Sequence, residues 1–301
     1  MKFLNPTNDL VFKRIFGQTT TKHVLRSFLN AVLELKKEYA ITEIEIANPH
    51  QVPHIKEFKE TLLDLFCIDQ RGYRYIVEVQ VLSTAFFDKR ILYYSSKAYV
   101  NQLLEGNNYS VLKPIIFLGI LDFNMFESDH YHSRHVILDA KTCEHTLKDF
   151  AFTFIELPKF HKSEEECTSI EDKWIYFLKN AKNLTLIPET IKEAEIKEAY
   201  TIANRYGWTP EELEYYEQLS FFKQDIIGTK TLAFDEGITK GIEVGRAEGR
   251  AEGRAEGREE AEIESRENAE AVQKRVIQNM LASGLSYEEI SCIMELPNPS
   301  K

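Results

Sequence analysis

The chain of 301 residues is 43% hydrophobic and 28% charged, a composition typical of a globular protein with one sizeable core and a smaller unit. It contains no run of about 18 apolar residues, which excludes a membrane-spanning helix. The net charge of −11 belongs entirely to residues 161–301, because residues 1–160 hold 19 basic and 19 acidic residues. The neutral first half can therefore present a basic strip to phosphates, whereas the acidic second half would repel DNA.

Targeting and disulfide signals are also missing from the sequence. Residues 1–6 lack the apolar core of a signal peptide. Four cysteines are scattered without metal-type spacing, namely Cys67, Cys143, Cys167 and Cys292. This usage fits a reducing compartment better than a disulfide framework, so we expect a cytoplasmic protein with no membrane partner.

The first predicted elements are two helices and a strand. Residues 7–17 predict a helix, because Thr7 or Asn8 can cap its start and Gly17 can end it. Residues 20–36 carry apolar side chains at helical spacing and predict a second, amphipathic helix. Residues 42–47 alternate between apolar and polar types and predict a strand.

A hairpin is the next predicted element. Residues 61–68 and 73–82 are rich in β-branched, aromatic and aliphatic residues, and residues 70–72 separate them. This three-residue loop ends in glycine, where a left-handed backbone is needed. If Asp69 and Tyr73 close the loop, the numbers of paired residues sum to 142.

The hairpin register places four side chains on one face of the sheet. Asp64 should lie opposite Glu78, and Leu62 should lie opposite Gln80. Two carboxylates about 5 Å apart repel by roughly 3 kcal/mol at an effective dielectric constant of about 20. A divalent cation turns this repulsion into attraction. The alternative is an exposed sheet face, on which Glu78 meets Arg74 or a lysine.

Residues 85–106 predict a third helix, and three strands should follow. Arg90 and Lys97 are seven residues apart on one face of that helix, where they could hold phosphates or simply face solvent. The expected strands are 113–123, 135–139 and 150–157. The histidines at 130, 132 and 135 do not predict a zinc site, because His132 and His135 would lie on opposite faces of a strand.

The C-terminal half predicts helices at 164–182, 188–205 and 209–229. Residues 245–258 then repeat the tetrapeptide Gly-Arg-Ala-Glu. Two interpretations remain open for this repeat, a helix whose small residues let another helix approach, and a flexible tether. A helical hairpin follows at the end, where Ser286 and Glu289 form a capping box. Glutamates at the start of its second helix make it a poor DNA reader, so we expect the C-terminal helical region to serve packing or a homo-oligomer.

Several motifs together resemble a known family. They are Asn5–Gly17 with the sequence NPTNDLVFKRIFG, Asp64 followed by Glu78-Val79-Gln80, the stretch Arg90–Tyr109, and Leu112–Ile120. The Asp and Glu-Val-Gln pattern is similar to the PD-(D/E)XK nuclease motif. The whole set resembles the recombination-promoting nuclease (Rpn) and transposase family. The chain departs from the general motif at Gln80, where most nucleases carry lysine, although similar family members often carry glutamine.

The resemblance implies an α/β fold with a restriction-endonuclease-like PD-(D/E)XK core, a mixed sheet flanked by helices, followed by a helical C-terminal region. The implied domains are a nuclease domain at 1–160, a helical subdomain at 161–235, and the repeat with the terminal hairpin at 236–301. The implied function is a Mg²⁺-dependent DNA endonuclease that promotes recombination. A non-catalytic protein-interaction or DNA-associated scaffold that retains the nuclease fold is the alternative.

The resemblance also implies roles for individual residues. Asp64, Glu78 and the Val79 carbonyl would bind Mg²⁺, and Gln80 would position the attacking water or the scissile phosphate. Asp9 and Lys13 would reach the metal site, or else form a surface pair within their helix. We expect Gln80→Lys to maintain or raise cleavage, because Leu62 opposite would leave room for a long side chain.

Overall fold

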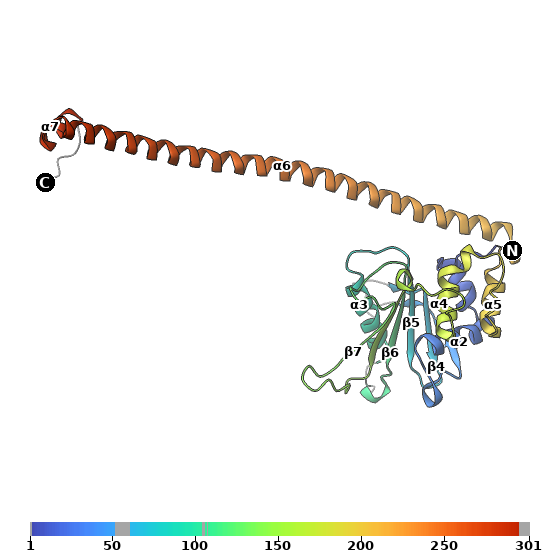
Figure 1. Ribbon diagram of the computed structural model, residues 1–301. Coiled ribbons are helices and arrows are strands. Elements are labelled where there is room, and N and C mark those ends of the chain that lie inside the picture. The colour runs from blue at the N-terminus through green and yellow to red at the C-terminus, as the bar shows by residue number, and fades with distance from the viewer. Residues whose placement is uncertain (1, 52–60, 104–105, 107, 295–301) are drawn as a thin grey trace. The chain divides into compact units, whose positions relative to one another are not determined.

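The computed structural model describes residues 2–51, 61–103, 106 and 108–294 (Figure 1). Residues 104–105 of the expected third helix and residue 107 of the motif 90–109 lie outside this part. The chain forms two compact units, Met1–Asp225 and Ile226–Lys301. None of the helices in the described ranges has an apolar stretch long enough to span a bilayer.

A six-stranded mixed sheet forms the centre of the first unit (Figure 1). Its strands in sheet order are β1 (Ile44–Ile46), β4 (Leu65–Asp69), β5 (Arg74–Gln80), β6 (Ile115–Leu121), β8 (Phe150–Glu156) and β7 (His132–Val136). The three strands β5, β6 and β8 are parallel, and the outer pairs are antiparallel. Helices cover both faces of the parallel strands, which explains the continuous apolar sequence of β6. The expected α/β fold is confirmed.

The two faces of the sheet contribute to different cores. One core contains residues of α1 (Asp9–Phe16), α2 (Lys22–Val32), α4 (Ile170–Asn180) and α5 (Ala194–Ala203), and the other contains residues of α3 (Phe87–Val100). Side chains alternate along β5, so Tyr75 and Val77 enter the larger core and Ile76 enters the smaller one. Trp174 of α4 packs edge-on against Phe28 of α2, with 5.6 Å between ring centroids.

Local sequence signals determine where α1 begins and ends. The Asn8 side chain accepts a hydrogen bond from the Leu10 N–H at 3.1 Å, as expected of a helix cap. At the other end the Gly17 N–H donates to the Lys13 carbonyl at 2.8 Å. A Cβ atom at position 17 would lie 2.7 Å from that carbonyl oxygen, so only glycine fits without a shift of the backbone.

The expected strand 61–68 is interrupted in the structure. Residues of β3 (Thr61–Leu62) pair with β2 (His50–Gln51), which places Leu62 opposite His50. The expected pairing of Leu62 with Gln80 is therefore wrong. The strand breaks at Asp64 because this side chain accepts a hydrogen bond from the Val79 N–H at 2.8 Å and so takes the place of a backbone partner.

The second unit is mostly one helix. The helix α6 (Pro210–Ala282) starts in the first unit and continues far beyond the expected end at residue 229. The Gly-Arg-Ala-Glu repeat is helical, which favours the helix interpretation over the tether. Each glycine costs about 1 kcal/mol relative to alanine, but Arg, Ala and Glu are strong helix formers. The terminal helix α7 (Tyr287–Ile293) begins at the capping box of Ser286 and Glu289, as predicted.

Candidate active site

The two predicted carboxylates meet where β4 and β5 pair. The ladder joins Leu65 with Val77 and Phe66 with Ile76, so the register with a sum of 142 is confirmed. Its continuation places Asp64, just before β4, opposite Glu78 of β5. The turn closes as expected, because the Asp69 N–H donates to the Tyr73 carbonyl at 3.0 Å.

Backbone hydrogen bonds hold the two carboxyl groups in place. The Asp64 N–H donates to Glu78 Oε1 at 3.2 Å, and the Val79 N–H donates to Asp64 Oδ2 at 2.8 Å. The Glu78 side chain is buried, with the residue only 7% exposed. This arrangement fixes oxygen atoms of both side chains without engaging all of their lone pairs, and each carboxylate can still accept from a ligand.

Burial makes the ionised pair costly. It raises the pKa of Asp64 and of Glu78, and the Asp64 charge raises the pKa of Glu78 further. The Val79 N–H opposes the rise at Asp64, whereas Arg90 and Lys13 oppose it at Glu78. A cation beside the two carboxyl groups would offset both effects, because its charge favours their ionised forms.

Gln80 contacts a cation of the neighbouring helix. Arg90 of α3 donates from Nη2 to Gln80 Oε1 at 2.5 Å, and Gln80 Nε2 donates to the Leu82 carbonyl at 2.7 Å. The Arg90 guanidinium also lies over the Phe87 ring, 4.9 Å from its centroid. Arg90 is therefore held beside the carboxylates. Lys97 lies two helical turns further along α3, about 10 Å away along the helix axis.

These contacts change the expectation for lysine at position 80. We now expect Gln80→Lys to lower cleavage and thermal stability, because a lysine ammonium would replace the acceptor of Arg90 with a like charge. Gln80→Met is the matched control, since it removes the acceptor without adding charge. Melting curves and nicking rates of both variants measure the effect. A Gln80→Lys protein that is more stable or more active than Gln80→Met would contradict the repulsion.

The predicted accessory residues on α1 form the expected surface pair, and their reach to a metal stays a prediction. Lys13 Nζ lies 3.1 Å from Asp9 Oδ1, so the two residues form an ion pair one turn apart. Both also act on the site, since the Asp9 charge raises the pKa of Asp64 and the Lys13 charge lowers it. The helix pair and the proximity to the carboxylates therefore coexist.

Sequence reasoning missed two residues beside this site, Asp122 and Lys223. Asp122 directly follows β6, and its N–H donates to the Gln80 carbonyl at 3.0 Å. Lys223 belongs to α6 and is half-buried. Burial lowers the pKa of Lys223, while the charges of Asp9, Asp64 and Asp122 raise it, so its ammonium group lies close enough to interact with the carboxylates.

Contacts at the start of α6 explain how Lys223 reaches the site. Arg14 of α1 forms an ion pair with Glu212 at 2.6 Å, and the Asn5 N–H donates to the Tyr216 hydroxyl at 3.3 Å. Tyr216 packs against the larger core. Lys223 follows Tyr216 by seven residues and so lies on the same face of the helix. The seven-residue spacing can be seen in the sequence, but the sequence does not show that this face of the helix packs against the first unit.

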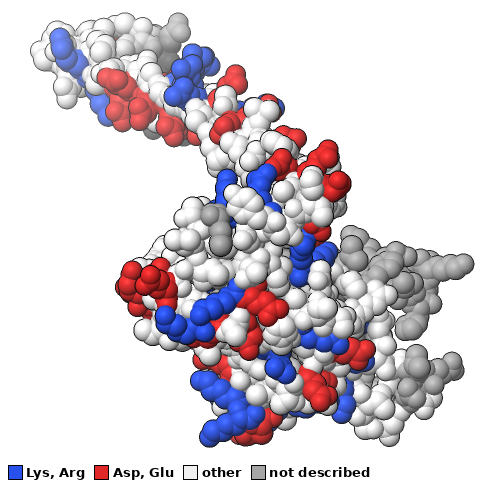
Figure 2. All heavy atoms as spheres, turned by 90° about the vertical axis from the view of Figure 1, so that its right-hand side faces the viewer, with Lys and Arg blue, Asp and Glu red and all other residues white. Residues whose placement is uncertain are grey.

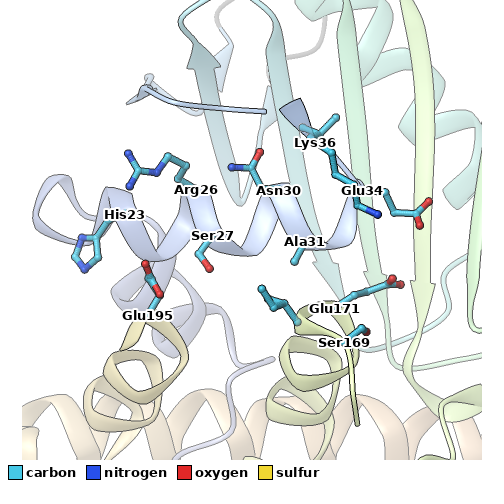
Figure 3. Close-up of a pocket in the computed structure, with 12 residues that line it drawn as sticks. His23, Arg26, Ser27, Asn30, Ala31, Glu34, Lys36, Ser169, Glu171 and Glu195 are labelled. Atoms are coloured by element: carbon cyan, nitrogen blue, oxygen red, sulfur yellow. The ribbon is translucent and has the colours of Figure 1, made fainter. Parts of the chain in front are cut away.

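A sizeable cavity lies elsewhere in the first unit. It has a volume of about 550 Å³ and is lined chiefly by α2 and the start of α4, with side chains such as Arg26, Lys36 and Glu171 around it (Figure 3). Neither Asp64 nor Glu78 lines it. Its acidic and basic side chains are mixed, and they do not converge on one type of ligand.

The histidine cluster forms no metal site in the described ranges. His132 Nδ1 lies 2.8 Å from Glu171 Oε1, whereas the His135 ring stacks on Phe126 with 4.6 Å between centroids. Basic and acidic side chains are intermingled on the face shown in Figure 2, which carries no continuous basic strip among its described residues.

Comparison with known families agrees with this geometry. Residues 6–229 match the family described as PD-(D/E)XK nuclease family transposase. The match covers the whole six-stranded sheet, the helices on both of its faces and the start of α6 that carries Lys223. No curated protein and no solved structure matches the chain.

Proposed function

Since the chain belongs to the PD-(D/E)XK nuclease family transposases, as its motifs indicate, we propose that it is a Mg²⁺-dependent DNA endonuclease whose strand breaks promote recombination. The observation that supports this proposal most directly is the buried pair of Asp64 and Glu78, held by backbone hydrogen bonds beside Arg90.

Plasmid nicking tests the proposed activity. Supercoiled plasmid should be nicked by the full chain with Mg²⁺ and left intact with EDTA. Cleavage that persists in EDTA would contradict the metal requirement. DNA binding without cleavage under any divalent cation would instead favour the non-catalytic scaffold.

The donor groups of the site fit a hard divalent cation. Mg²⁺ prefers oxygen ligands and is commonly held by one or two carboxylates together with substrate phosphate oxygens and waters. Asp64 and Glu78 supply the carboxylates, and the Val79 carbonyl is the proposed third protein ligand. The described residues contain no cluster of three or more His, Cys, Asp or Glu side chains that could hold a metal, so substrate and water would complete the coordination.

The side chains at the site have separate roles in the proposed reaction. Bound Mg²⁺ supplies an acidified water and stabilises charge on the scissile phosphate. Asp64 and Glu78 would hold the cation, and the Asp64 and Val79 N–H groups fix one oxygen of each carboxylate. Gln80 positions the Arg90 guanidinium, which in turn would bind a phosphate oxygen. Each end of the Gln80 amide retains one further hydrogen-bonding position for water or substrate.

Lys223 is the cation that could compensate for the missing motif lysine. Gln80 is uncharged and stabilises developing negative charge less than an ammonium group does. The Lys223 ammonium interacts with the charge of Asp64 and stands on a helix that the family match includes. In the proposed mechanism Lys223 contacts the phosphate from the α6 side of the site.

The raised pKa of Glu78 predicts a pH-dependent stability. With EDTA present, we expect Glu78→Gln to melt above wild type at pH 8 and to lose this advantage near pH 4. The ordinary pKa is 4.5, and burial raises it in the folded state. At pH values between the pKa of Glu78 in the unfolded chain and its raised pKa in the folded protein, the folded protein binds more protons. The wild-type free energy of unfolding therefore falls as pH rises between these two pKa values. Glutamine does not ionise, so the Glu78→Gln protein lacks this contribution to the pH dependence.

Thermal melts of both proteins from pH 4 to pH 8 measure this difference. Glu45→Gln is the matched control, because Glu45 is an exposed glutamate of the same sheet. A stability advantage of Glu78→Gln that stays constant across this range would contradict the raised pKa.

The second unit is the proposed contact for a homo-oligomer. Ile227, Phe234 and Ile238 of α6 are 45%, 68% and 46% exposed, and their spacing of seven and four residues places them along one seam of the helix. Sedimentation equilibrium of the full chain tests this proposal against a Phe234→Ser and Ile238→Ser variant. A wild-type protein that stays monomeric at tens of micromolar would contradict it.

A further inference from the structure

A second cavity lies at the opposite end of the sheet from the carboxylate pair. Its volume is about 290 Å³, near the lower end of the range for small-molecule sites. The strand register places Tyr75, Ile116 and Ala151 side by side, with Thr153 two residues further along β8. Glu78 is three residues from Tyr75 and therefore lies on the other face of the sheet. The cavity is thus separate from the proposed nuclease site.

The charged groups around this cavity are all basic. Arg71, Arg134, His145 and Lys148 line it, and no acidic side chain does. This bias stands out in a chain with 48 acidic and 37 basic residues. Such a wall favours an anion.

Two of these cations are available to a ligand. In the described part of the chain, the side chains of Arg134 and Lys148 form no hydrogen bond or ion pair. His145 has its Nε2 atom buried without a hydrogen-bond partner among the described residues. A buried polar atom left unpaired is unfavourable, and a ligand oxygen would satisfy it.

The remaining wall is mostly apolar and includes three tyrosines, Tyr39, Tyr73 and Tyr75. Arg71 is bonded to the buried Asp69, donating from Nε to Oδ2 at 2.8 Å, and its guanidinium lies 4.5 Å from the centroid of the Tyr73 ring. Arg71 therefore serves mainly to hold Tyr73. Tyr39 also lines the cavity and is 62% exposed, so its ring is open to stacking. Exposed aromatic rings beside phosphate-binding cations are the combination that holds a nucleotide base and its phosphate.

We propose that this cavity binds a phosphorylated nucleoside, with the phosphate at Arg134, Lys148 and His145 and the base against the exposed ring of Tyr39. A free mononucleotide and the phosphorylated end of a nucleic-acid strand both present such a base and phosphate. The volume accommodates one nucleotide unit and not a duplex. Binding here requires neither the carboxylate pair nor Mg²⁺.

Isothermal titration of the full chain in EDTA tests the proposal with three probes, namely 5′-deoxyadenosine monophosphate, deoxyadenosine and inorganic phosphate. The monophosphate should bind tightest, inorganic phosphate more weakly, and deoxyadenosine weakest. A 5′-phosphorylated oligonucleotide distinguishes the two sources, because it binds more tightly than the monophosphate only if the site takes a strand end. Equal affinity for deoxyadenosine and its monophosphate would overturn the proposal.

Three variants assign the binding to this cavity. The double variant Arg134→Gln with Lys148→Gln should lose at least about tenfold in affinity for the monophosphate. Lys141→Gln is the matched control, an exposed lysine of the same connection that does not line the cavity, and it should bind as wild type does. Tyr39→Ser should weaken the monophosphate and leave inorganic phosphate unchanged.

Asp64→Asn separates this proposal from the proposed nuclease function. It should retain monophosphate binding in EDTA whether or not the chain cleaves DNA. Loss of binding in Asp64→Asn, or full binding in the double variant, would place the ligand at the carboxylate pair and overturn the proposal.

Discussion

We expect Asp64→Asn and Glu78→Gln each to lower Mg²⁺-dependent nicking by at least about 1000-fold. Asp64 and Glu78 are the two carboxylates proposed as ligands, so either change would remove half of the ligand charge that faces the cation. Both amides keep an oxygen that can accept the existing backbone hydrogen bond, from the Val79 N–H at position 64 and from the Asp64 N–H at position 78. The chain should therefore remain folded, and the lost activity would report on the metal site alone.

Asp88→Asn provides the matched control for these variants. Asp88 is an exposed carboxylate in the first turn of α3, and it makes no contact with the pair. Its nicking rate should stay within about twofold of wild type. A folded Asp64→Asn or Glu78→Gln protein that nicks at the wild-type rate would remove these residues from the mechanism.

The hairpin register was predictable because its determinants are local. Gly72 has a φ of 81°, which glycine adopts readily and other residues rarely do. This turn fixes the number of loop residues, and the loop fixes which residues of β4 and β5 pair. The position of Glu78 relative to Asp64 follows from those two facts alone.

The interruption before β4 could not be predicted in the same way. Thr61 and Leu62 have strand-forming side chains, as the residues of β4 do, yet they pair with β2 and not with β5. The cause is the Asp64 side chain, which bonds to the Val79 N–H. A hydrogen bond between a side chain and a distant backbone group leaves no periodic trace in the sequence.

The contact between Arg90 and Gln80 was hidden for a related reason. Helical spacing grouped Arg90 with Lys97, because both lie on one face of α3. The structure instead places Arg90 against the end of β5, at 2.5 Å from the Gln80 side chain. Periodicity identifies residues on one face of a helix, but it does not show which end of that face meets the sheet.

Lys223 gives the largest expected effect outside the carboxylate pair. We expect Lys223→Met to lower nicking by about 100-fold, the size of effect seen when one donor to a developing negative charge is removed. Methionine keeps the length and apolar contacts of the lysine stem, so the packing of α6 near Tyr216 should be preserved. Burial lowers the pKa of Lys223, whereas the charges of Asp9, Asp64 and Asp122 raise it and so favour the protonated ammonium group. Removing it takes one counter-charge away from those carboxylates, while Asp9 keeps its ion pair with Lys13.

Steady-state kinetics separate the roles that Lys223 could have. A group that stabilises the transition state should lower kcat and kcat/KM by the same factor, whereas a group that only binds DNA should raise KM with kcat unchanged. We expect the first pattern, with partial recovery in Lys223→Arg because the charge is restored. Lys240→Met is the matched control, an exposed lysine of the same helix within the second unit. A Lys223→Met protein with wild-type kcat and kcat/KM would show that the charge missing at Gln80 is not replaced from α6.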